Sequence, residues 1–249
     1  MNVALPDNLH VLERGWLSAN NILCLDGDTA TLVDSGYVSH AEQTLALVRH
    51  TLAGKRLTRL LNTHSHSDHI GGNAALKAAY DCEIIVPAGL HAAIADWDQE
   101  ALLLSPLGQQ NARFQHDSLI GAGSEIEMGS LNWQALAVPG HDMEALAYYN
   151  PEKRILISGD ALWENGFGVI FPELLGEADG LRHTRATLEM LARLPSTSSS
   201  LATVGPSTPS TPPSSAPSGG WINSRKTSSN SPGMPSRSSS PSPCSKNGR

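Results

Sequence analysis

Three histidines and one aspartate fall within six consecutive residues of this chain, in the run His64-Ser65-His66-Ser67-Asp68-His69. The run directly follows an apolar stretch, Leu57–Asn62, which is typical of a buried strand. Imidazole and carboxylate are the ligands that zinc and similar divalent ions prefer. Residues two apart in an extended segment point the same way, so His64 and His66 can hold one ion. Asp68 and His69 lie past the bend and can point toward a second ion.

A chance cluster or a tag-like surface run is the alternative interpretation of these histidines. A tag would be terminal and homogeneous, whereas this run is internal and lies between a strand and two glycines. Two further polar residues follow expected strands, His141 after a Pro-Gly turn and Asp160 after residues 155–159. Each would alone be read as a turn or strand-end residue. Beside the histidine cluster, both become candidate metal ligands.

Short strands and helices follow one another over residues 1–194. The patterns predict strands at 10–13, 21–25, 29–33, 57–62, 83–86, 125–128, 131–138, 145–149 and 154–158. They predict helices at 40–54, 73–80, 88–97 and 181–194. Residues 100–124 contain a helical stretch without a clear period. Strands interspersed with helices favour an α/β protein with two sheets and helices outside them, and the pattern leaves the topology open.

Composition changes sharply at Pro195. Residues 195–249 contain 19 Ser and 10 Pro but no Asp, Glu or His, whereas residues 1–194 hold all 24 acidic residues and 12 of the 17 Lys and Arg. We therefore expect a folded domain over 1–194 and a Ser/Pro-rich tail over 195–249. A tail of this composition supplies little apolar surface for a core, which favours disorder.

The remaining composition excludes several classes of partner. An acidic body argues against nucleic acid, because phosphate binding needs concentrated positive charge. No apolar run approaches the roughly 20 residues that span a bilayer, and no basic stretch followed by an apolar core suggests a secretory signal. Cys24, Cys82 and Cys244 are widely spaced and form no CxxC pair, which fits a reducing compartment. We expect a cytoplasmic protein that acts on a small molecule; the oligomeric state stays open.

The motifs resemble those of the metallo-β-lactamase superfamily. THSHSDHIGG, at residues 63–72, is similar to the family's HxHxDH signature. Val138-Pro139-Gly140-His141 and Ser158-Gly159-Asp160-Ala161 resemble the second and third metal motifs, and residues 32–36 resemble the early strand that ends in an aspartate near the site. The four motifs occur in the family's order, and the resemblance covers roughly residues 8–194. The resemblance implies an αββα sandwich with a metal site at one edge of the two sheets.

The resemblance also implies roles for six residues. His64, His66 and His141 would hold one metal, Asp68 and His69 would hold the other, and Asp160 would bridge the two. One or two zinc ions are the expected cofactor, with iron or manganese as alternatives. Hydroxide between the metals would attack a carbonyl or phosphoryl centre, while Asp68 orients it and accepts a proton.

One expected motif is missing. Family members carry a last ligand in a Gly-His-Gly segment about forty residues past the bridging aspartate, but this chain has no histidine after His183. His183 lies at the start of a predicted helix, where a surface position is the simpler interpretation. Suppose the gene is read in the frame that begins at the third base of each codon. The nucleotides for residues 196–204 can then encode an apolar strand followed by Gly-His-Gly. Residues 220–248 can likewise encode an amphipathic helix. We therefore hypothesise a frameshift near Pro195, which would remove a terminal strand and helix as well as the last imidazole.

The leading hypothesis is a zinc-dependent hydrolase of a thioester, ester or lactone, similar to glyoxalase II. One alternative is a catalytically defective metal-binding product of a frameshifted gene. Others are a phosphodiesterase of the same superfamily and a diiron oxygen-reducing protein, which usually needs a flavin domain that is not found here. Residues 163–173 mix aromatic and apolar side chains, and either line a substrate pocket or pack over the second sheet.

Overall fold

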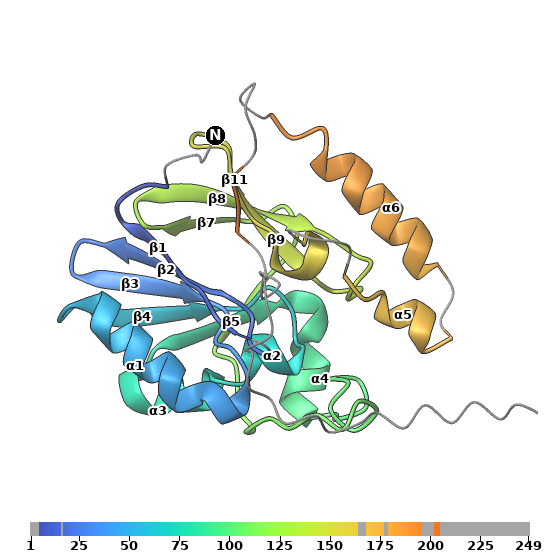
Figure 1. Ribbon diagram of the computed structural model, residues 1–249, viewed down its shortest axis with the longest axis horizontal. Coiled ribbons are helices and arrows are strands. Elements are labelled where there is room, and N and C mark those ends of the chain that lie inside the picture. The colour runs from blue at the N-terminus through green and yellow to red at the C-terminus, as the bar shows by residue number, and fades with distance from the viewer. Residues whose placement is uncertain (1–4, 16, 164–167, 177–178, 196–201, 205–249) are drawn as a thin grey trace, which may run out of the picture. The chain divides into compact units, whose positions relative to one another are not determined.

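Two β-sheets packed face to face form the centre of the fold (Figure 1). The computed structural model describes residues 5–15, 17–163, 168–176, 179–195 and 202–204. The first sheet has the order β1 (Leu9–Leu12), β2 (Asn21–Asp26), β3 (Thr29–Val33), β4 (Arg56–Leu61), β5 (Glu83–Pro87) and β6 (Ser118–Ile120). Strands β1 to β3 are antiparallel, and β3 to β6 are parallel.

The second sheet has the order β11 (Ala202–Val204), β10 (Ile155–Ile157), β9 (Leu146–Asn150), β8 (Leu131–Ala137) and β7 (Glu125–Met128). Its neighbours are antiparallel except for β10 and β11, which are parallel. Within each sheet, side chains alternate between the two faces, as the period of a strand requires. On β4, for example, Leu60 packs toward the helices and Leu61 packs between the sheets.

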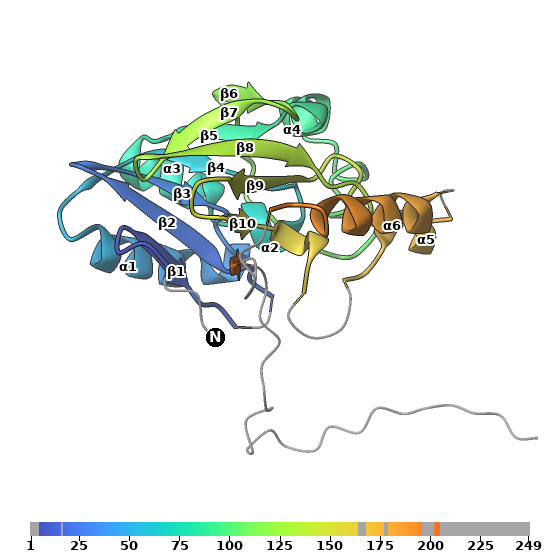
Figure 2. The same cartoon turned by 90° about the horizontal axis from the view of Figure 1, so that it is seen from above.

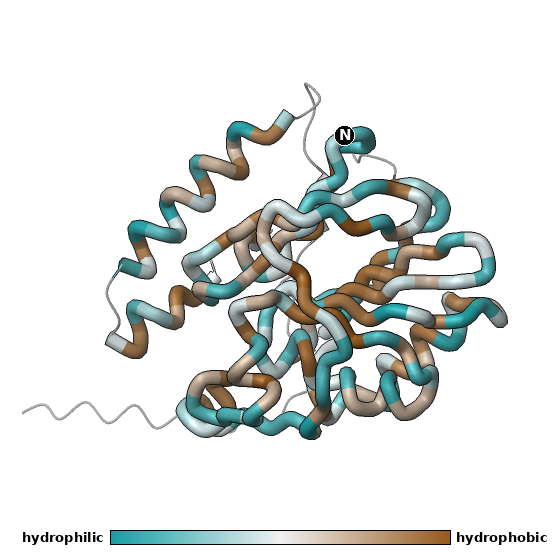
Figure 3. The backbone as a smooth tube through the Cα atoms, turned by 180° about the vertical axis from the view of Figure 1, so that it is seen from behind, coloured by the Kyte–Doolittle hydropathy of each residue, from teal (hydrophilic) through white to brown (hydrophobic). Residues whose placement is uncertain are grey.

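Helices cover the outer faces of both sheets and complete four layers (Figure 1). Seen from above, strands of the second sheet lie over those of the first (Figure 2). Helices α1 (Ala41–Leu52), α3 (Asn73–Tyr80) and α4 (His91–Asp96) pack on the first sheet, and α6 (Gly180–Leu191) packs on the second. Apolar and hydrophilic residues alternate along α6, which suits a helix with one covered face (Figure 3). The short helices are α2 (Ser67–Ile70), α5 (Phe171–Leu174), η1 (Val38–His40), η2 (Ala88–Leu90) and η3 (Gly159–Ala161). This arrangement confirms the predicted αββα sandwich.

The structure places most of the predicted strands and helices within a few residues of the expected bounds. The exception is 100–124, where turns occupy 99–108 and the only regular element is β6. A strand of three residues is too short to produce a visible period, and Leu119 at its centre is exposed. In the described part of the chain, no helix has the length and apolar character needed to cross a membrane.

The tail differs from expectation at one point. Ala202–Val204 form strand β11, parallel to β10, with Val204 opposite Ile157. We expected this edge strand to be missing and the whole tail to be disordered. Strand pairing uses backbone N–H and C=O groups, which residues of any composition except proline provide. Residues 196–201 and 205–249 lie outside the described part of the chain, so the expectation of disorder there stays a prediction.

We predict that Leu60→Ala lowers the free energy of unfolding by about 2–5 kcal/mol, because the side chain is fully buried between β4 and the helices. Leu119→Ala is the matched control, since the same atoms are removed from a side chain that is 45% exposed in the same sheet. Its cost should stay below about 0.5 kcal/mol. Urea titration of both variants measures the difference, and equal losses would contradict the packing described here.

Candidate metal centre

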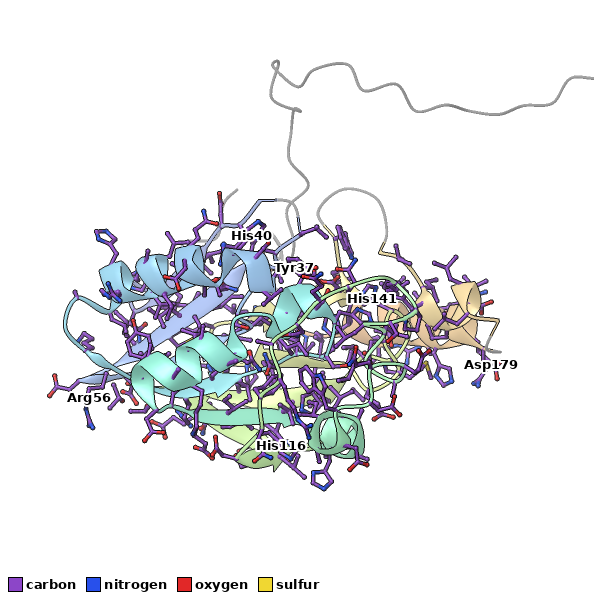
Figure 4. All side chains as sticks on the ribbon, turned by 90° about the horizontal axis from the view of Figure 1, so that it is seen from below. Tyr37, His40, Arg56, His116, His141 and Asp179 are labelled. Atoms are coloured by element: carbon purple, nitrogen blue, oxygen red, sulfur yellow. The ribbon has the colours of Figure 1, made fainter. Side chains whose placement is uncertain are left out.

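The predicted site residues gather at one edge of the sandwich, just past the ends of four strands. Asp34 follows β3, the His64–His69 run follows β4, His141 lies beyond β8, and Asp160 lies beyond β10. Parallel strands bring their carboxyl ends to one edge, which is where sites form in sheets of this kind. His141, labelled in Figure 4, lies on the side of the molecule that carries α5 and α6.

Two glycines allow the histidine run to turn back into a helix. A Cβ on Gly71 would lie 2.2 Å from the backbone nitrogen of Val38, and one on Gly72 would lie 2.5 Å from the carbonyl oxygen of Ser35. Only glycine permits this close approach of two backbones. Gly71 and Gly72 therefore allow the histidine run and α2 to pack closely against the segment that follows β3.

His64, His66 and His141 form a tight group of imidazoles. His64 Nε2 lies 3.0 Å from His66 Nδ1, which in turn lies 2.8 Å from His141 Nε2. Nitrogen ligands about 2.0–2.1 Å from a tetrahedral zinc ion would be about 3.3 Å apart, so the spacing is close to that of a metal site. All three side chains are buried.

In two of these rings the Nδ1 atom faces away from the group. Its hydrogen bond shows that it carries the proton, which leaves the lone pair of the ring on Nε2. His141 Nδ1 lies 2.5 Å from the carbonyl oxygen of Val169, which can only accept, so this nitrogen carries the proton. His64 Nδ1 lies 3.0 Å from Thr63 Oγ1. That hydroxyl donates to Asp34 and therefore accepts from His64. Both Nε2 atoms thus direct lone pairs at the common point, as metal ligands do.

A second group contains His64, His69 and Asp160. His69 Nε2 lies 3.0 Å from Asp160 Oδ1 and 3.8 Å from Asp68 Oδ2. Asp160 Oδ2 lies 3.3 Å from His141 Nε2, so this carboxylate reaches both groups. Asp68 is the most exposed of the six candidates, with 32% of its side chain accessible.

The buried carboxylate of Asp34 orients side chains of both groups. It accepts hydrogen bonds from the backbone nitrogen and the hydroxyl of Thr63, at 2.9 and 2.8 Å, and lies 2.8 Å from His69 Nδ1. A carboxylate that holds the outer N–H of a histidine fixes the orientation of the ring. Asp34 therefore orients His69 directly and His64 through Thr63.

The electrostatics differ between the two groups. Burial lowers the pKa of His64 and His66 well below the ordinary value, and neighbouring imidazoles lower it further. Both rings are therefore neutral at pH 7. Burial would also lower the pKa of His69, but the carboxylates of Asp160, Asp34 and Asp68 outweigh it and raise the pKa well above 6.5.

The two carboxylates beside His69 shift in opposite directions. Loss of solvent would raise the pKa of Asp160, but His69 and the other imidazoles lower it to about 2. Loss of solvent raises the pKa of Asp68; His69 opposes this shift, and the charge of Asp160 adds to it. The positive charge of His69 and the negative charge of Asp160 thus stabilise each other.

Several polar atoms here lack a hydrogen-bond partner within the described residues. They are His66 Nε2, His69 Nε2 and Asp160 Oδ1, all of them buried. The last two lie 3.0 Å apart, but not in hydrogen-bond geometry. Buried polar atoms are nearly always satisfied, so such orphans require a further partner. The donor set of imidazoles and carboxylates fits a divalent cation with one or two positions.

Sequence patterns did not identify three neighbours of the site. Asp142 lies 3.8 Å from His66 Nε2, and burial raises its pKa. The ring of Phe171 packs against His66 and His141, with centroids 4.6 and 5.2 Å away. The Val169 carbonyl holds His141. Asp142 could have been suspected as the residue after a candidate ligand. The other two belong to the 163–173 segment, for which the sequence offered a pocket wall as one interpretation but no contact with the ligands; Trp163, Gly168, Val169 and Ile170 of that segment do line a cavity beside His141. His183 contacts Arg182 on α6 and belongs to neither group.

A family model and several known proteins are similar to this chain. Residues 14–197 match the family model of the metallo-beta-lactamase superfamily. The hydroxyacylglutathione hydrolase of Rhodopseudomonas palustris strain HaA2 is 32% identical over 118 residues, which are 47% of this chain and 39% of that protein. The enzyme of the same name from Rhodospirillum rubrum is 34% identical over 134 residues, 53% of this chain and 45% of that protein. The chain therefore matches less than half the length of these relatives.

Solved structures share the fold at low sequence identity. The B3 metallo-beta-lactamase BLEG-1 has a TM-score of 0.62 and 21% identity, over 75% of this chain and 87% of that one. A metallo-beta-lactamase family protein of Thermus thermophilus has a TM-score of 0.60 and 21% identity, over 77% and 71% of the two chains. Because the family model spans well over half of its residues, this chain belongs to the metallo-beta-lactamase superfamily.

Proposed function

We propose that this chain is a metal-dependent hydrolase that holds one or two zinc ions and cleaves a thioester, ester or lactone. The observation that carries the proposal is the convergence of His64, His66 and His141 beside His69 and Asp160, with the lone pairs of His64 and His141 directed at a common point. In this proposal His64, His66 and His141 hold the first ion, and Asp68 and His69 hold the second. Asp160 reaches both.

A bound divalent ion would lower the pKa of water to about 7 and stabilise negative charge on a carbonyl oxygen. The chain's own residues supply the remaining functions. Asp34 and Thr63 hold the imidazoles in the required tautomers. Phe171 keeps water from one side of His66 and His141. Asp68, partly exposed at the edge, orients the attacking water and accepts its proton.

The thioester is the preferred substrate because the curated relatives reported above carry the name hydroxyacylglutathione hydrolase. Zinc-loaded protein should therefore be assayed on a hydroxyacylglutathione thioester, an aliphatic lactone, a β-lactam and a phosphodiester. We expect turnover of the thioester or lactone that is abolished by a chelator and restored by zinc. Turnover of the phosphodiester alone would replace this proposal with a phosphodiesterase.

A second candidate function is a metal-binding protein with an incomplete second position. It is favoured by the absence of any histidine after His183, where family members carry their last ligand. In that case the first position would bind zinc while turnover stays near background on every substrate. The nucleotide sequence around codon 195 decides whether a frameshift removed the ligand.

We predict that Asp68→Ala lowers kcat by several powers of ten, because both metal binding and water orientation are lost. The thermal midpoint should change little, since 32% of the side chain is accessible at the edge of the site. Asp81→Ala, at a carboxylate that is 95% exposed, is the control for loss of a surface charge. Turnover by Asp68→Ala within about twofold of the unaltered protein would remove Asp68 from the mechanism.

We predict that Asp34→Asn weakens zinc binding by about 10- to 100-fold. The amide of asparagine cannot accept from Thr63 and His69 as the carboxylate does, so His69 loses its fixed tautomer. Asp26→Asn is the matched control, because Asp26 accepts a hydrogen bond from Ser130 on the surface. Zinc competition against a chelator measures both, and unchanged affinity in Asp34→Asn would contradict the positioning role.

Metal binding should also depend on pH in a way that separates the two positions. The raised pKa of His69 means that its proton must leave before the second ion binds, so affinity there should rise with pH across and above 6.5. His64 and His66 are already neutral and release no proton. In the chelator competition, the second zinc equivalent should therefore show the steeper pH dependence. His69→Ala should remove that steep component, and its persistence would count against the assignment.

A further inference from the structure

A cavity of about 140 Å³ lies directly beside the candidate metal centre. It is lined by residues 138–141, 160–163 and 168–170, and by Thr184, Thr187 and Leu188 of α6. His141 and Asp160 thus belong both to the metal groups and to the cavity wall. A carbonyl presented to the metal edge would have its substituent within reach of this space.

The wall of the cavity offers almost no free hydrogen-bonding group. The hydroxyl of Thr187 donates to the carbonyl of Pro139 at 2.7 Å, and that of Thr184 donates to the carbonyl of Gly180 at 2.9 Å. His141 Nδ1 is held by Val169. Among the described lining residues, two buried side-chain atoms lack a partner: the indole N–H of Trp163 and Oδ1 of Asp160, which lies at the metal edge. Away from that edge, the cavity therefore suits a group that is mostly apolar.

The size of the cavity limits what it can hold. An apolar cavity of roughly 150 Å³ accommodates one benzene molecule, so 140 Å³ corresponds to about six carbon atoms. An acetyl group would leave most of the space empty. A long fatty chain would exceed it. Each methylene that moves from water into such a space contributes roughly fourfold in binding.

We propose that this cavity holds the acyl part of the substrate, and that the substrates are esters or thioesters of compact acyl groups of about four to six carbons. The inference rests on the hydrolase function proposed above and narrows its substrate class. Leu188 of α6 lines the cavity and is partly exposed, so the size of its side chain can be changed at little cost to folding.

The test is a series of thioesters of one thiol with acetyl, butyryl, hexanoyl and decanoyl groups, assayed with zinc-loaded protein. We expect kcat/KM to rise roughly fourfold per methylene up to about six carbons and then to level or fall. Leu188→Trp should lower kcat/KM for butyryl and hexanoyl at least about tenfold and leave acetyl within about twofold. Leu188→Ala should move the optimum to longer chains.

Leu188 is 44% exposed, so both substitutions are compatible with folding. Leu181→Trp is the matched control on the same helix, at a side chain that is 62% exposed and does not line the cavity. It should behave like the unaltered protein. Equal kcat/KM for all four acyl groups, or a loss in Leu188→Trp that is the same for every chain length, would overturn the proposal.

Benzene binding tests the cavity without turnover. Benzene should raise the thermal midpoint of the zinc-loaded protein and of Leu181→Trp, but not that of Leu188→Trp. If no thioester, ester or lactone is hydrolysed while this pattern holds, the hydrolase function fails and the apolar binding site stands. If benzene has no effect on the unaltered protein, the cavity assignment fails whatever the turnover.

Discussion

The candidate metal centre depends on one buried carboxylate. Asp34 is 2% exposed and holds Thr63 and His69 through three short contacts. Hydrogen bonds to an ionised group are about twice as strong as neutral ones, and in a buried setting they also hold their partners in one geometry. Because β3 and β4 are adjacent parallel strands, the carboxylate at the end of one reaches the histidine run at the end of the other. The pairing of β3 with β4 therefore also determines how the imidazoles are oriented.

The two sheets contribute to the site in different ways. The first sheet supplies the local run from His64 to His69, so its ligands are fixed by one turn and by the glycines after it. The second sheet supplies His141 and Asp160 from two separate strand ends. Those residues reach the run only when the apolar faces of both sheets are packed together. The buried core between the sheets is thus what joins the two halves of the candidate centre, and a loss of core packing would separate ligands that lie far apart in sequence.

Much of the fold and of the candidate site could be predicted from the sequence, because the chemistry is concentrated in short motifs. The candidate ligands of the histidine run are neighbours in sequence, so their spacing can be seen directly. The period of the apolar residues indicates most strands and helices. Other features depend on contacts between distant segments. Strand β6 is only three residues long, which is too short for a visible period. Strand β11 pairs through its backbone groups, which amino-acid composition does not indicate. Phe171 reaches His141 only because α5 folds back across the edge of the site. The ligand roles of the six residues stay predictions, although their convergence agrees with them.

The bond between His141 and Val169 ties the metal edge to the segment that leads into α5. That segment also forms a wall of the apolar cavity, and Phe171 follows it directly. A cation that fixes the ring of His141 would also fix the carbonyl that holds it, and ordering of the segment would in turn favour the ring position that the cation needs. Two such effects are reciprocal by thermodynamic necessity. If the metal and the acyl group bind as proposed, occupancy of the cavity and occupancy of the metal position are linked equilibria, and the protein would bind a compact acyl group more tightly when loaded than when stripped of metal.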